Sequence, residues 1–282
     1  MAHTTLDEAL AWASSQMQDN PSAKLDAMLL LCKATGFSRE FVIAHGAQTI
    51  DDVEEKTFAA DIKRRAAGFP LAYITKKKEF FGISFYVDER VLTPRPETEL
   101  LVQRAYEAAV DIKNPKILDL CCGSGCVGLT LAMLIKDADV TLADISAEAA
   151  KVAILNKSML VGERSNVSVA TSDLFSAFEG ELFDVVASNP PYIPSRDISG
   201  LAAEVRSEPM LALDGGVDGL SLIRKIIEEA PKHLKPKGTL AVEIGAGQAK
   251  QTMELMSNAG FKQVSAIEDY SGIERIASGV LV

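Results

Sequence analysis

The sequence lacks several features that mark common protein classes. No apolar run approaches the roughly 20 residues that a bilayer-spanning helix needs, and the start, MAHTTLDEAL, does not place an apolar segment after a basic one as a signal peptide does. His-Glu-x-x-His, Gly-x-Ser-x-Gly and Walker motifs are also missing. We therefore expect a cytoplasmic protein that does not interact with membranes.

Histidine and cysteine are scarce, and neither residue is spaced as a metal ligand. The three histidines lie far apart, and the four cysteines form no Cys-x-x-Cys pair with a histidine nearby. Three cysteines crowd into one short segment, which fits free thiols in a reducing compartment better than a disulfide framework. We expect no bound metal. The cysteines are Cys32, Cys121, Cys122 and Cys126.

Positive charge is also in short supply. Lysine and arginine number 29 against 39 acidic residues, which gives a formal net charge of −10. A protein that holds DNA or RNA by its phosphates usually presents a basic surface. A protein or small-molecule partner is therefore expected, with no direct nucleic-acid binding, and the basic runs at 63–65 and 76–78 are interpreted as solvated faces.

The chain is long enough for two domains, and 48% hydrophobic residues can form substantial cores. Residues 1–75 have helical patterns, with helices expected over 20–36 and 52–67, whereas 76–96 contains short aromatic and β-branched runs typical of a hairpin connector. From 97 to 282, strands and helices alternate, which predicts an α/β fold with a doubly wound, mostly parallel sheet. The seven expected strands are KILDL, DVTLAD, NVSVAT, FDVVASN, GTLAVEIG, FKQVSAIED and RIASGVLV.

A glycine loop, ILDLCCGSGCVGL, follows the first of these strands. Gly123, Gly125 and Gly128 have G-x-G-x-x-G spacing, which allows a tight turn and close approach of a ligand to backbone N–H groups. Asp144, at the end of the next strand, is placed to accept hydrogen bonds from ribose hydroxyls. Asp119 would repel a pyrophosphate but accept an ammonium group, so S-adenosyl-L-methionine is favoured over a nicotinamide dinucleotide.

The segment SNPPYIPS ends the fourth strand of this set, because proline cannot donate to a sheet ladder. The Asn189 side-chain oxygen and the Pro190 carbonyl can each accept one N–H of the same planar NH₂ group, and Tyr192 can stack on that group. Such acceptors gain strength as charge develops on a nitrogen that attacks a methyl group. If this strand neighbours the first, the turn faces the cofactor.

Several segments together resemble the PrmC or HemK family of S-adenosylmethionine-dependent N5-glutamine methyltransferases. They include PLAYITKKKEFFG, VLTPRPETELLV, ILDLCCGSGCVGLTLA, SNPPYIP and LALDGGVDGLSLIRKII, and the resemblance covers essentially the whole chain. It implies a Rossmann-like class I methyltransferase domain and a helical domain that helps dock the substrate. The implied reaction methylates the glutamine of the Gly-Gly-Gln motif in class 1 peptide chain release factors and leaves S-adenosyl-L-homocysteine, which modulates translation termination.

The resemblance also implies site residues. Asn189, Pro190, Pro191 and Tyr192 would hold the glutamine, and Arg95, Glu97 and Thr98 would support the site. Three departures stand out: Cys121 replaces a usual glycine, lysines fill 76–78, and Leu174 occupies an often aromatic position. The expected cofactor contacts are Asp119, Cys121, Cys122, Gly123, Ser124, Gly125, Asp144, Asp173, Leu174 and Asn189.

Three alternatives remain open from the residues alone. An N6-adenine methyltransferase of nucleic acid would use the same turn but needs a basic groove. A dehydrogenase would explain the glycine loop and Asp144 and leave the turn unexplained. A noncatalytic binding module would make the intact turn coincidental.

Overall fold

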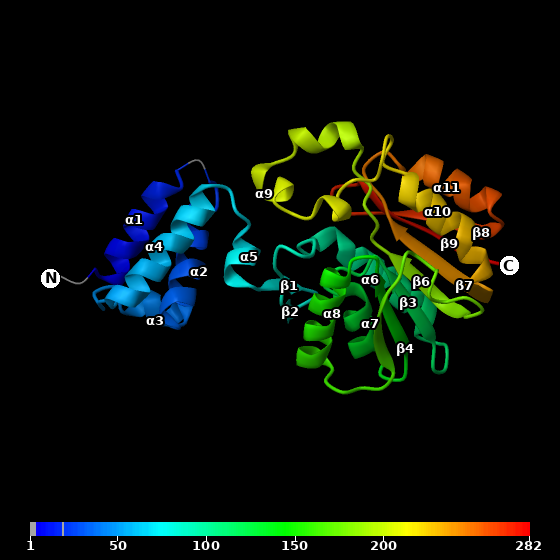
Figure 1. Cartoon of the computed structure of the whole chain (residues 1–282), viewed down its shortest axis with the longest axis horizontal. Coiled ribbons are helices and arrows are strands. Elements are labelled where there is room, and N and C mark those ends of the chain that lie inside the picture. The colour runs from blue at the N-terminus through cyan, green and yellow to red at the C-terminus, as the bar shows by residue number, and fades with distance from the viewer. Residues whose placement is uncertain (1–3, 19) are drawn as a thin grey trace. The chain divides into compact units, whose positions relative to one another are not determined.

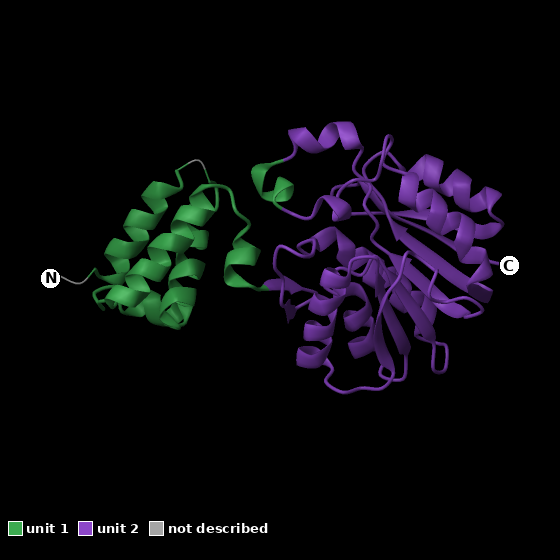
Figure 2. Ribbon diagram, in the orientation of Figure 1, with its two compact units in different colours: residues 1–77, 202–207 green, residues 78–201, 208–282 purple. Residues whose placement is uncertain are grey.

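The computed structural model describes residues 4–18 and 20–282, and the chain divides into two compact units (Figure 2). Unit 1 contains residues 1–77 and 202–207, and unit 2 contains 78–201 and 208–282. Each unit has its own hydrophobic core. Within the described residues, no helix combines the length and apolar character needed to span a membrane.

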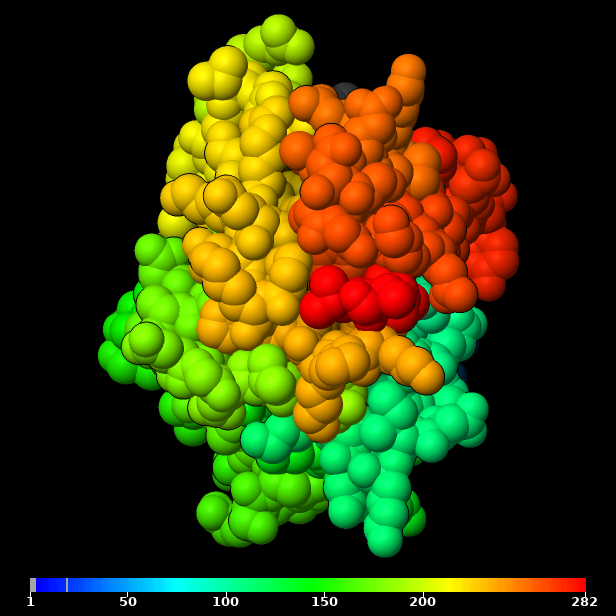
Figure 3. Space-filling view, turned by 90° about the vertical axis from the view of Figure 1, so that its right-hand side faces the viewer, coloured from blue at the N-terminus to red at the C-terminus, as the bar shows by residue number. Residues whose placement is uncertain are grey.

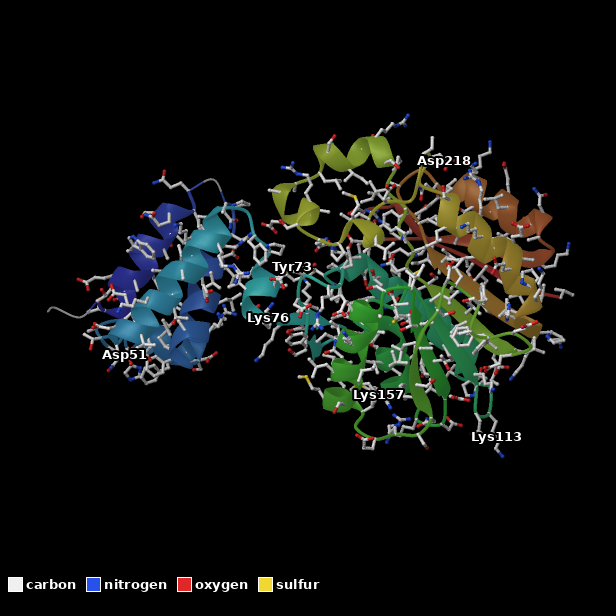
Figure 4. The ribbon with its side chains drawn as sticks, viewed as in Figure 1. Asp51, Tyr73, Lys76, Lys113, Lys157 and Asp218 are labelled. Atoms are coloured by element: carbon white, nitrogen blue, oxygen red, sulfur yellow. The ribbon has the colours of Figure 1, made fainter. Side chains whose placement is uncertain are left out.

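Unit 1 is helical, as the sequence predicts. Asp51, labelled in Figure 4, caps the longest of these helices by accepting hydrogen bonds from the N–H groups of Val53 and Glu54. Buried apolar side chains from several of the helices, including Leu30, Leu31 and Phe58, form the core. The helices are α1 (Leu6–Gln16), α2 (Ala23–Thr35), α3 (Arg39–Ala44), α4 (Asp52–Ala66), α5 (Leu71–Thr75) and α9 (Ala203–Arg206).

A buried arginine explains why residues 202–207 group with the N-terminal helices. The Arg65 guanidinium on α4 donates to Asp26 Oδ2 on α2 at 2.6 Å and lies 2.5 Å from Glu204 Oε1 on α9. Its side chain is only 7% exposed, and a buried cation is stable only when paired in this way. The sequence alone predicts this short segment as part of the 97–282 domain, because nothing local to it indicates its partner.

Unit 2 is a seven-stranded sheet with helices on both sides, which confirms the expected fold class and all seven strands (Figure 1). The order is β5-β4-β3-β6-β7-β9-β8. Neighbouring strands are parallel except in the two pairs that contain β9, which are antiparallel. The strands are β3 (Lys116–Leu120), β4 (Asp139–Asp144), β5 (Val167–Thr171), β6 (Phe183–Ser188), β7 (Leu234–Glu243), β8 (Phe261–Glu268) and β9 (Glu274–Leu281). The helices are η1 (Pro96–Thr98), α6 (Glu99–Ala109), α7 (Cys126–Leu134), α8 (Ala147–Leu160), η2 (Ser195–Gly200), η3 (Met210–Ala212), α10 (Ser221–Glu229), η4 (Ala230–Lys232) and α11 (Ala249–Asn258).

Both faces of the sheet are buried because successive strand residues point to opposite sides. Ile117 and Val185 belong to the core with α6, α7 and α8, whereas Leu118 and Val186 belong to the core with α10 and α11. Figure 3 shows α10 in yellow beside α11 in orange on the second face. A sheet covered in this way presents its carboxyl edge as the place for a ligand.

A short hairpin precedes the sheet, as expected for the connector. Strands β1 (Lys78–Phe80) and β2 (Ile83–Phe85) pair antiparallel, and Phe81 and Gly82 between them have φ of 53° and 70°. The Phe81 N–H donates to Glu99 Oε1 at 2.8 Å. Further along, Asn156 on α8 hydrogen-bonds both the backbone of Tyr86 and the Ser124 carbonyl, and so joins the connector to the glycine loop.

Candidate active site

The sheet order brings the glycine loop and the Asn-Pro-Pro-Tyr turn together. Strand β3 lies between β4 and β6, with Leu120 paired to Ala143 on one side and to Ser188 on the other. The loops after these strands therefore emerge side by side at the carboxyl edge. They border a cavity of about 580 Å³ in unit 2.

Most of the predicted site residues line this cavity. Gly125, Pro190 and Tyr192 do not form part of its wall, and neither do Gly128, Arg95 and Glu97. Residues that the sequence analysis did not single out also contribute, notably Met210 and Leu211 of η3. The predicted residues in the wall are Asp119, Cys121, Cys122, Gly123, Ser124, Asp144, Asp173, Leu174, Asn189, Pro191 and Thr98.

The glycine loop owes its shape to left-handed backbone at alternate positions. Cys121, Gly123 and Gly125 have φ of 57°, 54° and 79°. A Cβ at Gly125 would lie 2.8 Å from Leu142 Cδ2, so this glycine is needed for packing where α7 begins rather than for lining the cavity. Cys121 adopts the glycine-like conformation despite its side chain. Burial raises the pKa of its thiol to about 12, so it meets the cavity uncharged.

Asp119 is the penultimate residue of β3 and is 1% exposed. Its Oδ2 accepts the Gly128 N–H at 2.8 Å, so the carboxylate holds the first turn of α7 against the strand. Burial raises the pKa of Asp119 to about 7, the nearby Asp144 charge adds to this shift, and the Gly128 N–H opposes it. The carboxyl group thus sits in the cavity wall with few partners, available to a positively charged ligand group.

Asp144 organises the loop from the end of β4. Its Oδ2 accepts the Gly123 N–H and its Oδ1 accepts the Ser146 N–H, both at 2.9 Å. Burial raises its pKa as well. Beside it, the buried Ser124 Oγ has no hydrogen-bond partner in the described part of the chain. An orphaned hydroxyl and two acidic side chains in one wall suit a ligand that carries both hydroxyl and ammonium groups.

The Asn-Pro-Pro-Tyr turn is held by side-chain hydrogen bonds at both of its ends. Asn189 Nδ2 donates to Thr98 Oγ1 at 3.2 Å, and no described residue donates to Asn189 Oδ1. The Tyr192 hydroxyl donates to Glu243 Oε1 at 3.2 Å, while Gln248 Nε2 donates to the Tyr192 carbonyl at 2.9 Å. Tyr192 therefore faces β7 in this structure, and its stacking on a substrate stays a prediction.

A glycine-rich loop, residues 214–219, packs directly on this turn. A Cβ at Gly215 would lie 2.8 Å from the Pro191 carbonyl oxygen, and one at Gly219 would lie 2.3 Å from that of Tyr192. Asp218, labelled in Figure 4, closes the loop by accepting the Leu220 N–H and pairing with Arg224. Only glycine permits this close approach.

Sequence reasoning missed two buried glutamates near the site. Glu208 Oε2 lies 2.6 Å from Arg95 Nη2, and Glu208 Oε1 accepts the Thr93 N–H at 3.4 Å. Burial raises the pKa of Glu208, and Arg95 opposes the shift. Glu243, at the end of β7, contacts Tyr192. Both glutamates hydrogen-bond residues that are distant in the sequence, so no local sequence pattern indicated them.

Comparisons with known proteins identify related sequences for both the helical part and the sheet-containing part of the chain. Residues 8–75 match the family model of the PrmC N-terminal domain, and residues 96–205 match that of the methyltransferase small domain. The release factor glutamine methyltransferase of Clostridium acetobutylicum is 37% identical over 259 residues, 90% of each chain. The enzyme of the same name from Salmonella typhimurium is 36% identical over 267 residues, 95% of each chain.

A solved structure shows the same fold at lower sequence identity. It is the 16S rRNA N2 G1207 methyltransferase RsmC of T. thermophilus in complex with AdoMet and guanosine, with a TM-score of 0.54 and 16% identity over 73% of this chain and 50% of that one. The fold and the site together define a Rossmann-like methyltransferase. The identity and coverage of the relatives then place the chain more narrowly: it belongs to the release factor glutamine methyltransferase family.

Proposed function

We propose that this protein transfers a methyl group from S-adenosyl-L-methionine to the N5 nitrogen of the Gly-Gly-Gln glutamine in class 1 peptide chain release factors. The reaction would take place in the cytoplasm, leave S-adenosyl-L-homocysteine and modulate translation termination. The observation that carries the proposal is the Asn-Pro-Pro-Tyr turn beside a glycine loop at one cavity, in a chain of this family. Relatives named for glutamine do not favour the adenine alternative.

The cavity wall offers groups that suit the cofactor. Asp144 would accept hydrogen bonds from the ribose hydroxyls, Asp119 would face the ammonium group, and the unpartnered Ser124 hydroxyl would gain a partner. Leu174 and Asp173 would contact the adenine side in place of a stacked aromatic ring. The cofactor supplies an electrophilic methyl group on its sulfonium.

The turn would orient the glutamine, whose amide lone pair is delocalised and weakly nucleophilic. Asn189 Oδ1, which accepts no hydrogen bond from the described residues, would take one N–H of the amide. The Pro190 carbonyl would take the other. Both bonds strengthen as the nitrogen becomes positive, so they stabilise the transition state more than the bound substrate. Water can accept the proton after transfer, and no general base is required.

The helical unit would contribute to recognition of the release factor. Its match to the PrmC N-terminal domain supports this assignment, as does the net charge of −10, which disfavours direct binding to nucleic acid. The partner we propose is therefore the release factor protein.

Mass spectrometry tests the proposal directly. An unmethylated release factor is incubated with the protein and S-adenosyl-L-methionine, digested and mapped. We expect one added methyl on the Gly-Gly-Gln glutamine, and none on a matched release factor in which that glutamine is replaced by alanine. No gain on the unaltered factor, with cofactor binding established by calorimetry, would refute the substrate assignment.

A further inference from the structure

Two adjacent apolar side chains in the cavity wall are exposed to solvent. Met210 and Leu211 of η3 line the cavity, yet their exposed fractions are 56% and 58%. A single exposed apolar side chain needs no explanation, but a pair of them in a ligand cavity is surface that a ligand can cover. Because Met210 and Leu211 are both exposed and part of the wall, they lie where the cavity opens to solvent, and we call this pair the apolar rim.

Backbone hydrogen bonds join the apolar rim to the segment that follows the Asn-Pro-Pro-Tyr turn. The Ile193 N–H donates to the Leu213 carbonyl at 3.1 Å, and the Gly215 N–H donates to the Ile193 carbonyl at 2.9 Å. These two bonds form a parallel bridge between Ile193 and Asp214. Within η3, the N–H groups of Leu213 and Asp214 both donate to the Met210 carbonyl at 3.0 Å. The rim is therefore attached to the turn that would hold the substrate amide.

Buried residues hold the apolar rim from both sides along the chain. Glu208, two residues before Met210, is 6% exposed, and its Oε2 lies 2.6 Å from Arg95 Nη2. Leu213, two residues after Leu211, is 3% exposed. An exposed loop tip is normally mobile, whereas these contacts fix the backbone on each side of the rim. Its two side chains are thus exposed on a held segment of backbone.

The charges in the cavity wall disfavour an acidic group beside the apolar rim. Asp214, just after η3, accepts hydrogen bonds from Ser195 Oγ at 2.7 Å and from the Gly216 N–H at 2.9 Å, and these bonds lower the pKa of its carboxyl group. An acidic group beside the rim would lose water to apolar side chains and meet this ionised carboxylate. The acidic members of the wall are Asp119, Asp144, Asp173 and Asp214, and the basic ones are Arg90 and Lys225.

We propose that Met210 and Leu211 are specificity-determining residues: they cover the residue beside the substrate glutamine and admit a small or apolar neighbour but disfavour an acidic one. This inference rests on the proposed function, in which the glutamine amide reaches Asn189 inside the cavity, and it names the residues that select the segment around that glutamine. The Gly-Gly-Gln sequence meets the requirement, because glycine places no side chain against the rim.

Alanine variants test whether the apolar rim contacts the substrate. Met210→Ala and Leu211→Ala should each raise KM for the release factor roughly fivefold to tenfold, because each loses apolar contact area. Their kcat should change little, since this contact is the same in the substrate complex and the transition state. The Kd for S-adenosyl-L-methionine should stay within about twofold, and the melting temperature should not change. A matched control is Met159→Ala, because Met159 on α8 is 61% exposed and lies outside the cavity wall.

A pair of altered release factors tests the selection against acidic neighbours. The glycine before the substrate glutamine is replaced by asparagine in one and by aspartate in the other, so the two differ in charge and hardly in shape. We expect kcat/KM of the unaltered protein to be roughly tenfold lower on the aspartate factor. Leu211→Lys should reduce this ratio to about twofold, because an exposed ion pair contributes up to about fivefold. Met159→Lys adds the same charge on α8 and should leave the ratio unchanged.

Several outcomes would overturn the inference. They are an unchanged KM in both alanine variants, a rise in the Kd for S-adenosyl-L-methionine as large as the rise in KM, equal kcat/KM of the unaltered protein on the two altered factors, or the same ratio in Leu211→Lys as in Met159→Lys. If Leu211→Lys does not fold, Met210→Lys decides in its place. Absence of methyl transfer to the Gly-Gly-Gln factor by the unaltered protein is a different result, and it would refute the proposed function instead.

Discussion

Cys121 is a strained position in the glycine loop, and glycine should be better tolerated there than alanine. At φ of 57° a residue with a Cβ pays roughly 1–2 kcal/mol relative to the right-handed region. Glycine avoids that cost but loses roughly 0.5–1 kcal/mol through its greater freedom in the unfolded chain. Because Cys121→Ala also removes the sulfur while keeping the Cβ, Cys121→Gly should exceed Cys121→Ala in stability by about 0.5–1 kcal/mol.

Urea unfolding of the two variants, fitted to the transition of unit 2, measures this difference. A shift of this size moves the melting temperature by about 2–3 °C. Calorimetric titration with S-adenosyl-L-methionine shows in addition whether the thiol at the cavity wall alters affinity. If Cys121→Gly proves less stable than Cys121→Ala, the left-handed conformation is not a source of strain and the reasoning fails.

Three further predictions concern the same edge of the sheet. Asn189→Ala should lower kcat on the order of 100-fold in a radiolabelled methyl-transfer assay without changing the melting temperature, and normal turnover would exclude its orienting role. Gly128→Ala places a Cβ 3.0 Å from Asp119 Oδ2, so it should cost about 1–3 kcal/mol in urea unfolding; a neutral effect would show that the strand end can shift. The pKa of Glu243, about 7, lies above its ordinary 4.5, so the folded state binds more protons and stability falls as pH rises between these values. Glu243→Gln should flatten that decline in urea midpoints, and an unchanged slope would mean that the carboxyl group is not buried in solution.

Patterns local to the chain predicted most of the fold. Strand and helix alternation identified all seven strands. At the start of α8 the Ser146 hydroxyl accepts the Ala149 N–H, a cap that depends only on near neighbours. Helix α7 begins at Cys126, where Gly125 caps it with a left-handed φ of 79°. Local signals of this kind are readable because they depend on near neighbours in the sequence.

The parts of the site that the sequence did not indicate depend on distant partners. The glycine loop and the Asn-Pro-Pro-Tyr turn were found by their motifs, and the adjacency of β3 and β6 confirmed that they meet. Glu208 and Glu243 carry no motif, since their hydrogen-bond partners Arg95 and Tyr192 lie 113 and 51 residues away in the chain. Tyr192 was expected at a substrate, yet its hydroxyl contacts a carboxylate that only the tertiary structure places beside it.

Two of the buried carboxyl groups at this edge reduce the stability of the fold, which is itself an argument for their function. Asp119 accepts one backbone hydrogen bond, and Glu243 has an oxygen with no partner among the described residues, while burial raises both pKa values to about 7. A neutral isostere would avoid most of this cost, which for Glu243 amounts to roughly 3 kcal/mol at high pH for a shift from 4.5 to about 7. Glu243→Gln should therefore gain stability at neutral pH, the opposite of what loss of a stabilising carboxylate would do. A loss of stability in Glu243→Gln would show instead that the buried charge stabilises the fold.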